Sequence, residues 1–564
     1  MRKNEKVVYL SVALIIALNV LVYVNTLKVP FQFDDVKFIE ENKNILEPLD
    51  IKAFIHTYFL RGVVRWTYAV NYLIGKFNTI NYHIANLSIH IIISILFFII
   101  LRHLYSSRKW NLPLLATLLF SLHPVQIESV TYLMSRSELL ATFFYLLAFY
   151  FFINSIRNNS SNHVKSIFFL IATLICFFLG LGSKLTIVSL PIMLIIYLYV
   201  VNDKSNMLSI TRKHKWPLLG VLAAFTLFLV RKAFFTRSGL LGIQGMAIEQ
   251  YGRWGYFITE VKAFYLYYLK LLLFPINLNI NPDYPYSLSL WQAIGFLILT
   301  LFLMIFSVKS LKKLPLLFFS IFWMFITLSP TSSIVPLNDL VAEHRLYLPS
   351  LGFFIATSLA IVKPKRLSET VKTVLAVNLV IALSILTVQR NSVWNDETSL
   401  WEDAVKKSPL HVRSYLNVGR SYYYDKMLKK AVAAYEKANK IDPFYFESHY
   451  NLGTIYHEWG NNDKAVKEFS FALQLNKNLP EAYISLGKIY MEQKKHDKAI
   501  NIFKAALHLE TDCPVCFRNI AIIYYYQLKD YKKAKFYFQQ TLRLDPEQSQ
   551  NHEIQSIIDY LNTF

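Results

Sequence analysis

The sequence lacks the short motifs that identify many nucleotide-driven and hydrolytic enzymes. It contains no glycine-rich phosphate loop, no His-Glu-x-x-His zinc motif and no serine nucleophile elbow. It has no ATPase unit, which counts against a primary pump of the ABC type. Its apolar segments show no obvious internal repeat of the kind that many secondary transporters have. These absences count against each of those classes.

Cysteine is also scarce, with three residues in a chain of 564. Cys176 lies in an apolar run, where packing is its expected role. Cys513 and Cys516 form a single C-x-x-C pair. A lone pair cannot complete a four-ligand zinc site, and no βαβ context supports a thioredoxin-type motif. A structural disulfide and two free thiols remain as alternatives, and the role of the pair stays open.

Basic residues outnumber acidic ones, and the formal net charge is +22. A nucleic-acid-binding protein would gather such charge on one soluble face. Here much of the Lys and Arg falls in short loops between apolar runs, which is the bias that orients membrane helices. The charge therefore indicates a membrane protein, and no nucleic-acid partner is expected.

Hydrophobic residues make up 54% of the chain, and the excess lies almost wholly before Arg390. We predict an all-α protein with a membrane domain at residues 1–390 and a repeat domain at residues 391–564. The membrane domain has about eleven apolar runs of spanning length. These runs are Val7–Val24, Ile84–Leu101, Leu112–Leu133, Leu139–Ile153, Ile167–Gly182, Ile187–Val201, Trp216–Phe234, Leu290–Val308, Leu316–Ser329, Leu346–Val362 and Val371–Val388.

The basic loops predict the orientation. Six clusters of Lys and Arg fall on one side of the membrane if the N-terminus is cytoplasmic. The apolar stretch Trp254–Pro275 carries three charges and is expected to be an interfacial helix rather than a span. The segments Lys28–Tyr82 and Arg237–Ser289, and everything after Gln389, are then outside the cytoplasm.

After Asn391 the pattern changes to amphipathic helices with a fixed period. Asn417-Val418-Gly419-x-x-Tyr422 recurs 34 residues later at Asn451–Tyr456 and again at Ser485–Tyr490. This step is that of the tetratricopeptide repeat (TPR), which has two antiparallel helices per unit. A fourth unit at Asn519–Pro546 carries one inserted residue. Such an α-solenoid usually binds an extended polypeptide in a concave groove, and a spacer or dimerisation arm is the alternative.

Two adjacent carboxylates, Asp34 and Asp35, follow the first apolar helix. Neighbouring carboxylates at an apolar boundary raise each other's proton affinity, as general bases often require. The alternative is that one of them caps a helix at Val36–Glu41.

Three cations are expected near the outer membrane face: Lys184, Arg345 and Arg136. An ammonium and two guanidinium groups suit a phosphate at the headgroup level, although each could also snorkel or pair with lipid. Asp283 in the second outer loop is a weaker candidate, since a turn is its simpler role.

Several motifs along the chain resemble those of one known family, the transmembrane and TPR-containing O-mannosyltransferases and their bacterial relatives. The match runs through the membrane part and into the tail. The motifs are Phe33-Asp34-Asp35, Arg65 before Asn71, Tyr82-His83-x-x-Asn86, His123-Pro124-Val125-x-x-Glu128, Arg136-x-x-Leu139-Leu140-Ala141, His344-Arg345-Leu346-Tyr347-Leu348-Pro349 and Arg390-Asn391-x-x-Trp394.

The resemblance implies the GT-C fold of membrane glycosyltransferases, with a catalytic first outer loop. It implies an inverting enzyme that moves a sugar, with mannose favoured, from a polyprenyl- or dolichyl-phosphate carrier to Ser or Thr hydroxyls of exported proteins. The repeats would bind the acceptor polypeptide. Asp34 or Asp35 would be the catalytic base. The expected substrate-binding residues are Arg65, His123, Glu128, Arg136, Lys184, Asp283, His344 and Arg345.

The chain departs from the family pattern after Lys184, where an acidic residue is usual and Leu185 stands instead. How Lys184 is held is therefore open. No metal is assigned, and a divalent ion between the two carboxylates is possible but not favoured.

Two other functions remain as alternatives. One is a GT-C transferase that glycosylates a lipid or cell-wall polymer, and the other is a non-enzymatic membrane scaffold or flippase. The chain ends in Asn562-Thr563-Phe564 without a retrieval signal, which favours a bacterial inner membrane with the repeats in the periplasm over the endoplasmic reticulum membrane.

Overall fold

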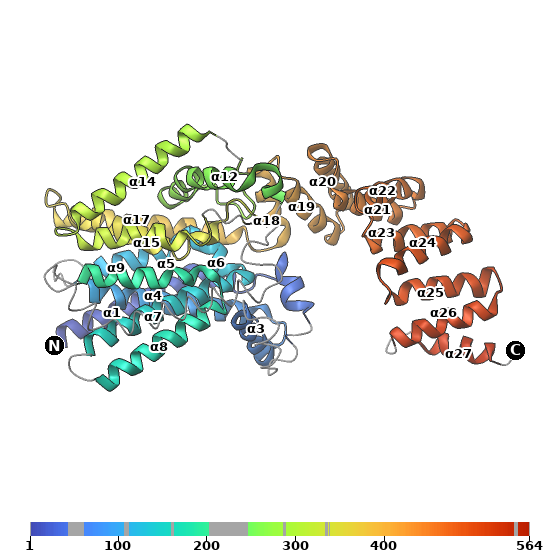
Figure 1. Cartoon of the computed structure of the whole chain (residues 1–564), viewed down its shortest axis with the longest axis horizontal. Coiled ribbons are helices and arrows are strands. Elements are labelled where there is room, and N and C mark those ends of the chain that lie inside the picture. Colours follow the sequence, from blue (N-terminus) through green and yellow to red (C-terminus); the bar gives the residue numbers. More distant parts are fainter. Residues whose placement is uncertain are drawn as a thin grey trace. The chain divides into compact units, whose positions relative to one another are not determined.

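A computed structural model describes residues 2–42, 45, 61–105, 112–158, 163–201, 246–285, 289–332, 337, 339–545 and 551–562. Within these ranges every regular element is helical, as predicted, and no strand occurs (Figure 1). The chain divides into two compact units, Met1–Asp403 and Ala404–Phe564. This division lies later in the sequence than the predicted boundary at residue 390, because the segment after the last membrane helix packs on the first unit.

Six described helices of the first unit are long and apolar enough to span a membrane. An uninterrupted helix satisfies its own backbone hydrogen bonds, which lipid cannot do. The bent pair α5 and α6 makes a seventh candidate, and three shorter apolar helices fall on the other predicted runs. The run predicted at 216–234 lies outside the described residues. The six are α1 (Arg2–Tyr23), α4 (Thr79–Leu104), α7 (Arg136–Asn158), α8 (His163–Leu181), α14 (Leu290–Ser310) and α17 (Glu369–Ser392).

The bend between α5 (Leu112–Ser121) and α6 (Ile127–Thr131) measures 54°. Pro124 lies at the break, in a short 3-10 turn. Because proline has no backbone N–H and excludes the preceding residue from the helical region, the helix cannot continue through it. The bend directs the chain toward the end of the bundle that is opposite to the N-terminus, which we call the far end (Figure 1).

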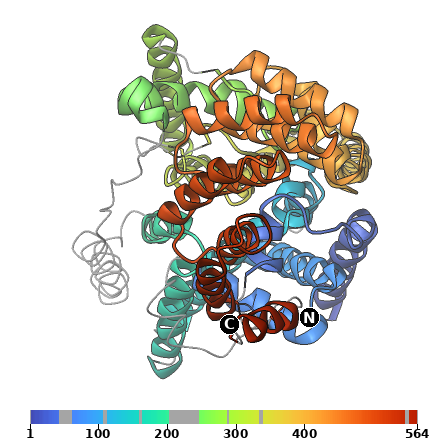
Figure 2. The same cartoon turned by 90° about the vertical axis from the view of Figure 1, so that its right-hand side faces the viewer.

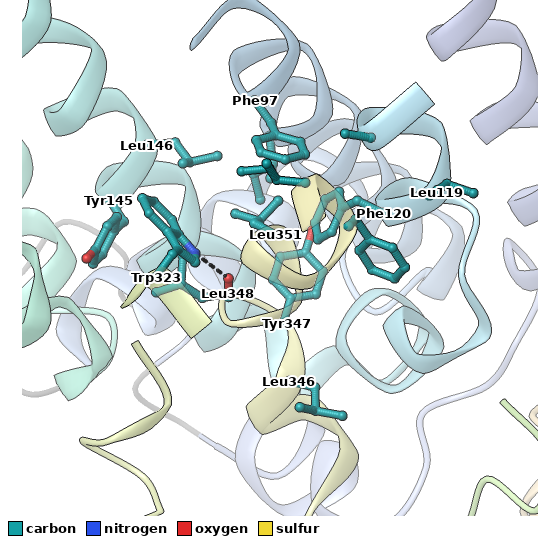
Figure 3. Close-up of a cluster of buried hydrophobic side chains, with 14 of the residues drawn as sticks. Phe97, Leu119, Phe120, Tyr145, Leu146, Trp323, Leu346, Tyr347, Leu348 and Leu351 are labelled. Carbon is teal, nitrogen blue, oxygen red and sulfur yellow. Dashed lines mark hydrogen bonds between the residues drawn. The ribbon is translucent and has the colours of Figure 1, made fainter. Parts of the chain in front are cut away.

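The core of the first unit includes buried side chains of α4, α5, α7, α15 (Pro315–Leu328) and α16 (Ser350–Val362), part of which Figure 3 shows. Trp323 crosses this core, and its indole nitrogen donates a 2.9 Å hydrogen bond to the carbonyl oxygen of Leu348. A Cβ atom on Gly352 would lie 2.4 Å from the carbonyl oxygen of Ser320. Glycine therefore permits the close approach of α15 and α16 that seats the loop before α16.

The stretch predicted to be interfacial is helical. It comprises α12 (Met246–Ala263), a π-helical turn at Phe264–Tyr268 and α13 (Leu269–Leu273). None of it is among the helices that qualify as spans. Its position relative to the membrane surface stays a prediction.

The second unit consists of consecutive antiparallel helix pairs, which Figure 2 shows in successive layers. In the first three pairs a glycine of the first helix faces an aromatic ring of the second, so that a Cβ would come within 2.6–2.8 Å of that ring. The pairs are α19 (Val412–Tyr424) with α20 (Leu428–Ile441), α21 (Phe446–Glu458) with α22 (Asn462–Leu475), α23 (Pro480–Glu492) with α24 (His496–Leu509), and α25 (Pro514–Ile522) with α26 (Tyr531–Leu544); α27 (Asn551–Leu561) follows.

The fourth repeat shows how one inserted residue is accommodated. A π-helical turn at Ile523–Gln527 extends α25 before the chain turns into α26. A π turn holds one more residue than an α turn, so the insertion lengthens the helix without disturbing the pairing.

The cysteine alternatives are also resolved. Cys513 and Cys516 form a disulfide at the start of α25, and both side chains are buried. Cys176 is a buried thiol in α8.

Candidate functional site

The predicted site residues come mainly from loops and helix ends at the far end of the bundle. Asp34 and Asp35 follow α1, Lys184 follows α8, and His344 and Arg345 form a 3-10 turn before α16. Tyr132, at the junction of α6 and α7, lies within electrostatic reach of Asp34, Asp35 and Glu128. The fold therefore brings carboxylates from separate segments to one region.

The two adjacent carboxylates have different surroundings. Asp35 is 2% exposed, and its oxygens accept hydrogen bonds from the backbone N–H groups of Met134 at 2.9 Å and Gln32 at 3.3 Å. Burial raises the pKa of Asp35 to about 8, and the charge of Asp34 adds to the effect. Asp34 is only half-buried. Asp35 makes no side-chain capping hydrogen bond to the helical turn that follows, so the capping alternative does not describe it.

The backbone before Asp34 adopts an unusual conformation. Phe33 has a φ of 52°, in the left-handed region that side chains disfavour. Its ring packs against Tyr132 and Trp401, with centroid distances of 6.3 and 5.3 Å. The Gln32 side-chain amide donates to the backbone oxygen of Trp394 at 2.7 Å. These contacts hold the strained loop in place and fix where Asp34 projects.

Arg136 is fully enclosed at the start of α7. Its Nε donates to Asn86, one Nη donates to Asn71 and Thr67, and the other donates to the backbone oxygen of Tyr82. The two short bonds, to Asn86 and Asn71, are 2.6 Å long. All five N–H groups of a guanidinium form a fixed fork, and here that fork is directed at protein acceptors. This placement differs from the phosphate-facing position expected from sequence, because the acceptors lie on helices before α5.

Lys184 forms an ion pair with Glu138 of α7. The Lys184 side chain is 23% exposed, whereas Glu138 is 3% exposed. This pair answers the question raised by Leu185, because the carboxylate that orients Lys184 comes from the start of α7 and not from the next residue. The sequence feature that points to Glu138 is its position two residues after Arg136, which is itself a candidate site residue.

Glu128 and His344 form a second pair at the far end. One Glu128 oxygen is 2.6 Å from Nδ1 of His344, and the other accepts from the His344 backbone N–H at 3.1 Å. Glu128 is 5% exposed and His344 is 24% exposed. A carboxylate at Nδ1 favours the tautomer whose proton lies there, which leaves Nε2 as a hydrogen-bond acceptor.

Arg345 points the other way, into the protein. It donates to the backbone oxygens of Leu340 and Asp339 and lies 3.3 Å from a carboxylate oxygen of Glu260 in α12. Its side chain is 4% exposed. Glu260 was not predicted as a site residue, since its place in an apolar stretch indicated only an interfacial helix.

The remaining three candidates are more loosely connected to this region. His123 is 1% exposed, and its Nδ1 accepts from the Val125 N–H at 3.2 Å, so it shapes the break after α5. Arg65 is half-buried on α3 (Gly62–Gly75), whose Val63 N–H donates to Gly182 near Lys184. Asp283 is exposed in the segment after α13.

Within the described ranges, no cluster of three or more His, Cys, Asp or Glu side chains is arranged to hold a metal ion.

Fold and sequence comparison together define the class: a multi-helix membrane protein that ends in tetratricopeptide repeats. Family models described as TPR repeat match residues 419–460 and 453–494, and one described as tetratricopeptide repeat matches residues 480–513 and 519–548. The crystal structure of MamA is 23% identical, covers 27% of this chain and 87% of its own, and has a TM-score of 0.25.

The chain is similar, more particularly, to the TPR-containing O-mannosyltransferases, and the resemblance of its motifs to that family is confirmed. Protein O-mannosyl-transferase F38B6.6 of Caenorhabditis elegans is 24% identical over 73% of this chain and 59% of that protein. Human protein O-mannosyl-transferase TMTC3 is 22% identical over 75% of this chain and 50% of that protein. The chain thus spans between half and three fifths of the length of these two relatives.

Proposed function

We propose that the protein is a membrane glycosyltransferase that moves mannose from a polyprenyl- or dolichyl-phosphate carrier to Ser or Thr hydroxyls of exported polypeptides. The proposal is supported by two features at one end of the bundle, the half-buried carboxylate of Asp34 and a lysine held by Glu138, in a chain similar to protein O-mannosyl-transferases. The first group suits a base and the second suits a phosphate.

Asp34 is the base in this mechanism. Its carboxylate takes the proton of the acceptor hydroxyl while the hydroxyl oxygen attacks the anomeric carbon. The bond from that carbon to the phosphate oxygen breaks at the same time, and the configuration inverts. Asp35 is less suited to this task because its oxygens already accept from the backbone, and we assign it the role of holding the loop.

Lys184 stabilises the departing lipid phosphate. Its ammonium is partly exposed and held by Glu138, so it is positioned before the donor arrives. His344 is held by Glu128 through Nδ1, which leaves Nε2 able to bind a sugar hydroxyl. Arg136 and Arg345 have their N–H groups committed to protein acceptors, which supports a positioning role for both.

The orientation belongs to the same proposal. The basic loops favour a cytoplasmic N-terminus, which puts the far end and the repeats outside the cytoplasm, in the bacterial periplasm or the lumen of the endoplasmic reticulum. The repeats collect the acceptor polypeptide and raise its concentration near Asp34.

The test uses the full chain in nanodiscs with radiolabelled mannosyl polyprenyl phosphate and a fraction of exported proteins. We expect label in protein, and its loss in the Asp34→Asn variant. Asp497→Asn, on the exposed first turn of α24, is the matched control and should retain transfer. Label in lipid or polymer alone would overturn the protein acceptor, and full transfer by the Asp34→Asn variant would overturn the base.

A further inference from the structure

Each of the four tetratricopeptide repeats turns from its first helix into its second through a backbone of the same shape. One residue in each turn has a positive φ, with values of 61°, 72°, 58° and 53° along the chain. These residues are Lys426, Gly460, Lys494 and Lys529. They are 34, 34 and 35 places apart, and the longer last step contains the residue inserted in the fourth repeat. The four turns are therefore structurally equivalent.

The four turns lie along one edge of the repeat array. Every short turn reverses the chain, so the connections between successive helices alternate between two edges. Each first helix contacts the first helix of the next repeat, as α19 contacts α21, α21 contacts α23 and α23 contacts α25. We call the edge with the turns inside the repeats the turn edge (residues 424–430, 458–464, 492–498 and 526–533), and the edge with the connections between repeats the link edge (residues 440–446, 474–480 and 508–514).

The turn edge exposes large aromatic side chains. Tyr424, Trp459 and Tyr526 each lie within three residues before the positive-φ position, and they are 68%, 44% and 58% exposed. Leu528, in the fourth turn, is also exposed. Tyrosine and tryptophan combine an apolar ring with a polar group, and they are enriched where a membrane meets water. Three of the four turns thus expose a side chain suited to that boundary.

Lysine residues accompany these aromatic side chains. The turn edge contains ten lysines and six acidic residues, whereas the link edge contains two lysines and three acidic residues. Phe444 is exposed at the link edge too, so charge is the property that distinguishes the two edges. A bilayer with acidic headgroups has a negative surface above an apolar interior. An edge that exposes aromatic rings and carries a net positive charge is complementary to such a surface.

Three of the four positive-φ positions carry a lysine. Glycine is the residue that this conformation favours, and Gly460 shows that glycine fits the same turn. The side chains of Lys426, Lys494 and Lys529 are exposed, and within the described part of the chain none of the three forms an ion pair. Their charges are therefore free to interact with an external anionic partner.

We propose that the turn edge lies against the surface of an anionic phospholipid bilayer. The lysine ammonium groups pair with lipid phosphates, and the rings of Tyr424, Trp459 and Tyr526 enter the headgroup layer. The first unit is a multi-pass membrane unit, so a bilayer surface is tethered near the repeats. Tethering raises the effective concentration of that surface, and individually weak contacts then suffice. This proposal concerns the repeats alone and does not depend on the transfer reaction.

The experiment uses the full chain in nanodiscs that each hold one copy. One set of discs contains phosphatidylcholine alone, and the other contains about 30% phosphatidylglycerol, which gives the surface a negative charge. A neutral amine-reactive reagent labels exposed lysines, and mass spectrometry of the digested protein gives the rate at each position. We expect Lys426, Lys494 and Lys529 to react at least threefold more slowly in the anionic discs.

Two controls are built into the same measurement. Lys440 and Lys477 are exposed on the link edge and should react at equal rates in both kinds of disc. Salt at about 0.5 M screens the attraction and should abolish the protection of the turn-edge lysines.

Variants test the charge and the aromatic rings separately. Lys494→Glu combined with Lys529→Glu should remove most of the protection of Lys426, because each lysine near an anionic surface contributes roughly fivefold to binding. Lys440→Glu combined with Lys477→Glu makes the same change of charge on the link edge and should leave that protection intact. Trp459→Ala removes one ring without changing the charge and should reduce the protection by a smaller amount. Melting temperatures equal to that of the native chain show that each variant is folded.

The other outcomes would each overturn the proposal. Equal labelling rates in the two kinds of disc would do so, as would equal loss of protection in the two double variants. Protection that appears only in discs holding two copies would assign the turn edge to a second chain. Protection that requires an added acidic polypeptide, whatever the lipid, would assign it to a protein partner.

Discussion

The rings of Phe33 and Trp401 pack edge to face, with centroids 5.3 Å apart and an interplanar angle of 70°. One residue precedes the proposed base, and the other belongs to α18 (Glu397–Lys407), the first helix after the membrane domain. Arg390 and Asp403 form an ion pair across the same segment, and the Asn391 amide donates to Val22 at the end of α1. The start of the tail is thus a structural part of the loop that carries Asp34.

Removing the Trp401 ring should displace Asp34. Trp401→Ala deletes the surface that holds Phe33 in its left-handed conformation, so we expect kcat to fall by about a hundredfold, as for a misplaced catalytic group. The donor KM should change little because Lys184 is not touched. Trp401→Phe keeps an aromatic ring and should restore most of the rate. Steady-state kinetics of both variants measure this, and a rise in KM at unchanged kcat would contradict the positioning role.

The buried Asp35 predicts a pH effect on stability. Its pKa in the folded chain is about 8, above the ordinary value of 3.8, so the folded chain binds the extra proton between these values. Stability should therefore fall as pH rises from about 4 to about 8, by at most roughly 1.4 kcal/mol per pH unit. Asp35→Asn removes this contribution. Melting temperatures at pH 5, 6.5 and 8 should show that the native chain loses more stability than Asp35→Asn, and parallel curves would contradict the shift.

Lys184 and Glu138 should have unequal effects on transfer. Lys184→Met removes the charge opposite the leaving phosphate and should reduce kcat by about a hundredfold. Glu138→Gln keeps the ammonium and loses only its orientation, so a smaller loss is expected. Lys165→Met, at the exposed opposite end of α8, is the matched control. Single-turnover rates at saturating donor test the order, and equal losses for Lys184→Met and Lys165→Met would contradict the assignment.

Arg136 should matter for stability more than for phosphate binding. Arg136→Lys cannot reach Asn86, Asn71 and Tyr82 together, and the loss of these hydrogen bonds should cost about 2–4 kcal/mol. Arg157→Lys, at the exposed end of the same helix, should have no effect. Thermal unfolding in detergent measures the difference. A variant with native stability and a raised donor KM would instead support the phosphate contact that the sequence indicated.

Periodicity made most of the fold predictable. The step of 34 residues defined the repeats, and ten of the eleven predicted apolar runs fall on described helices. The total of eleven spans is not established, since Trp216–Phe234 lies outside the described residues. The similarity to O-mannosyltransferases was also predictable from the sequence, because the order of the motifs is recognisable although the overall identity is low.

The details of the site were not predictable, because they depend on contacts between distant segments. The sequence placed Arg136 at a membrane boundary, where a phosphate is a reasonable partner, but its acceptors come from α3 and α4. Asp34 and Asp35 are adjacent in sequence and could not be distinguished until Met134 was seen to bind only the second. Glu138 could not be predicted as the partner of Lys184, because this contact depends on the packing of α7 against α8.

The Cys513–Cys516 disulfide encloses only two residues, so it restrains little of the unfolded chain and contributes at most about 2 kcal/mol. It joins no distant elements and cannot act as a scaffold. Both cysteines are buried at the start of α25, so a reductant can reach the bond only when this helix opens locally. Whether the bond is present therefore depends on the compartment in which the tail folds. The mass of the unreduced protein shows whether that compartment allowed the bond to form.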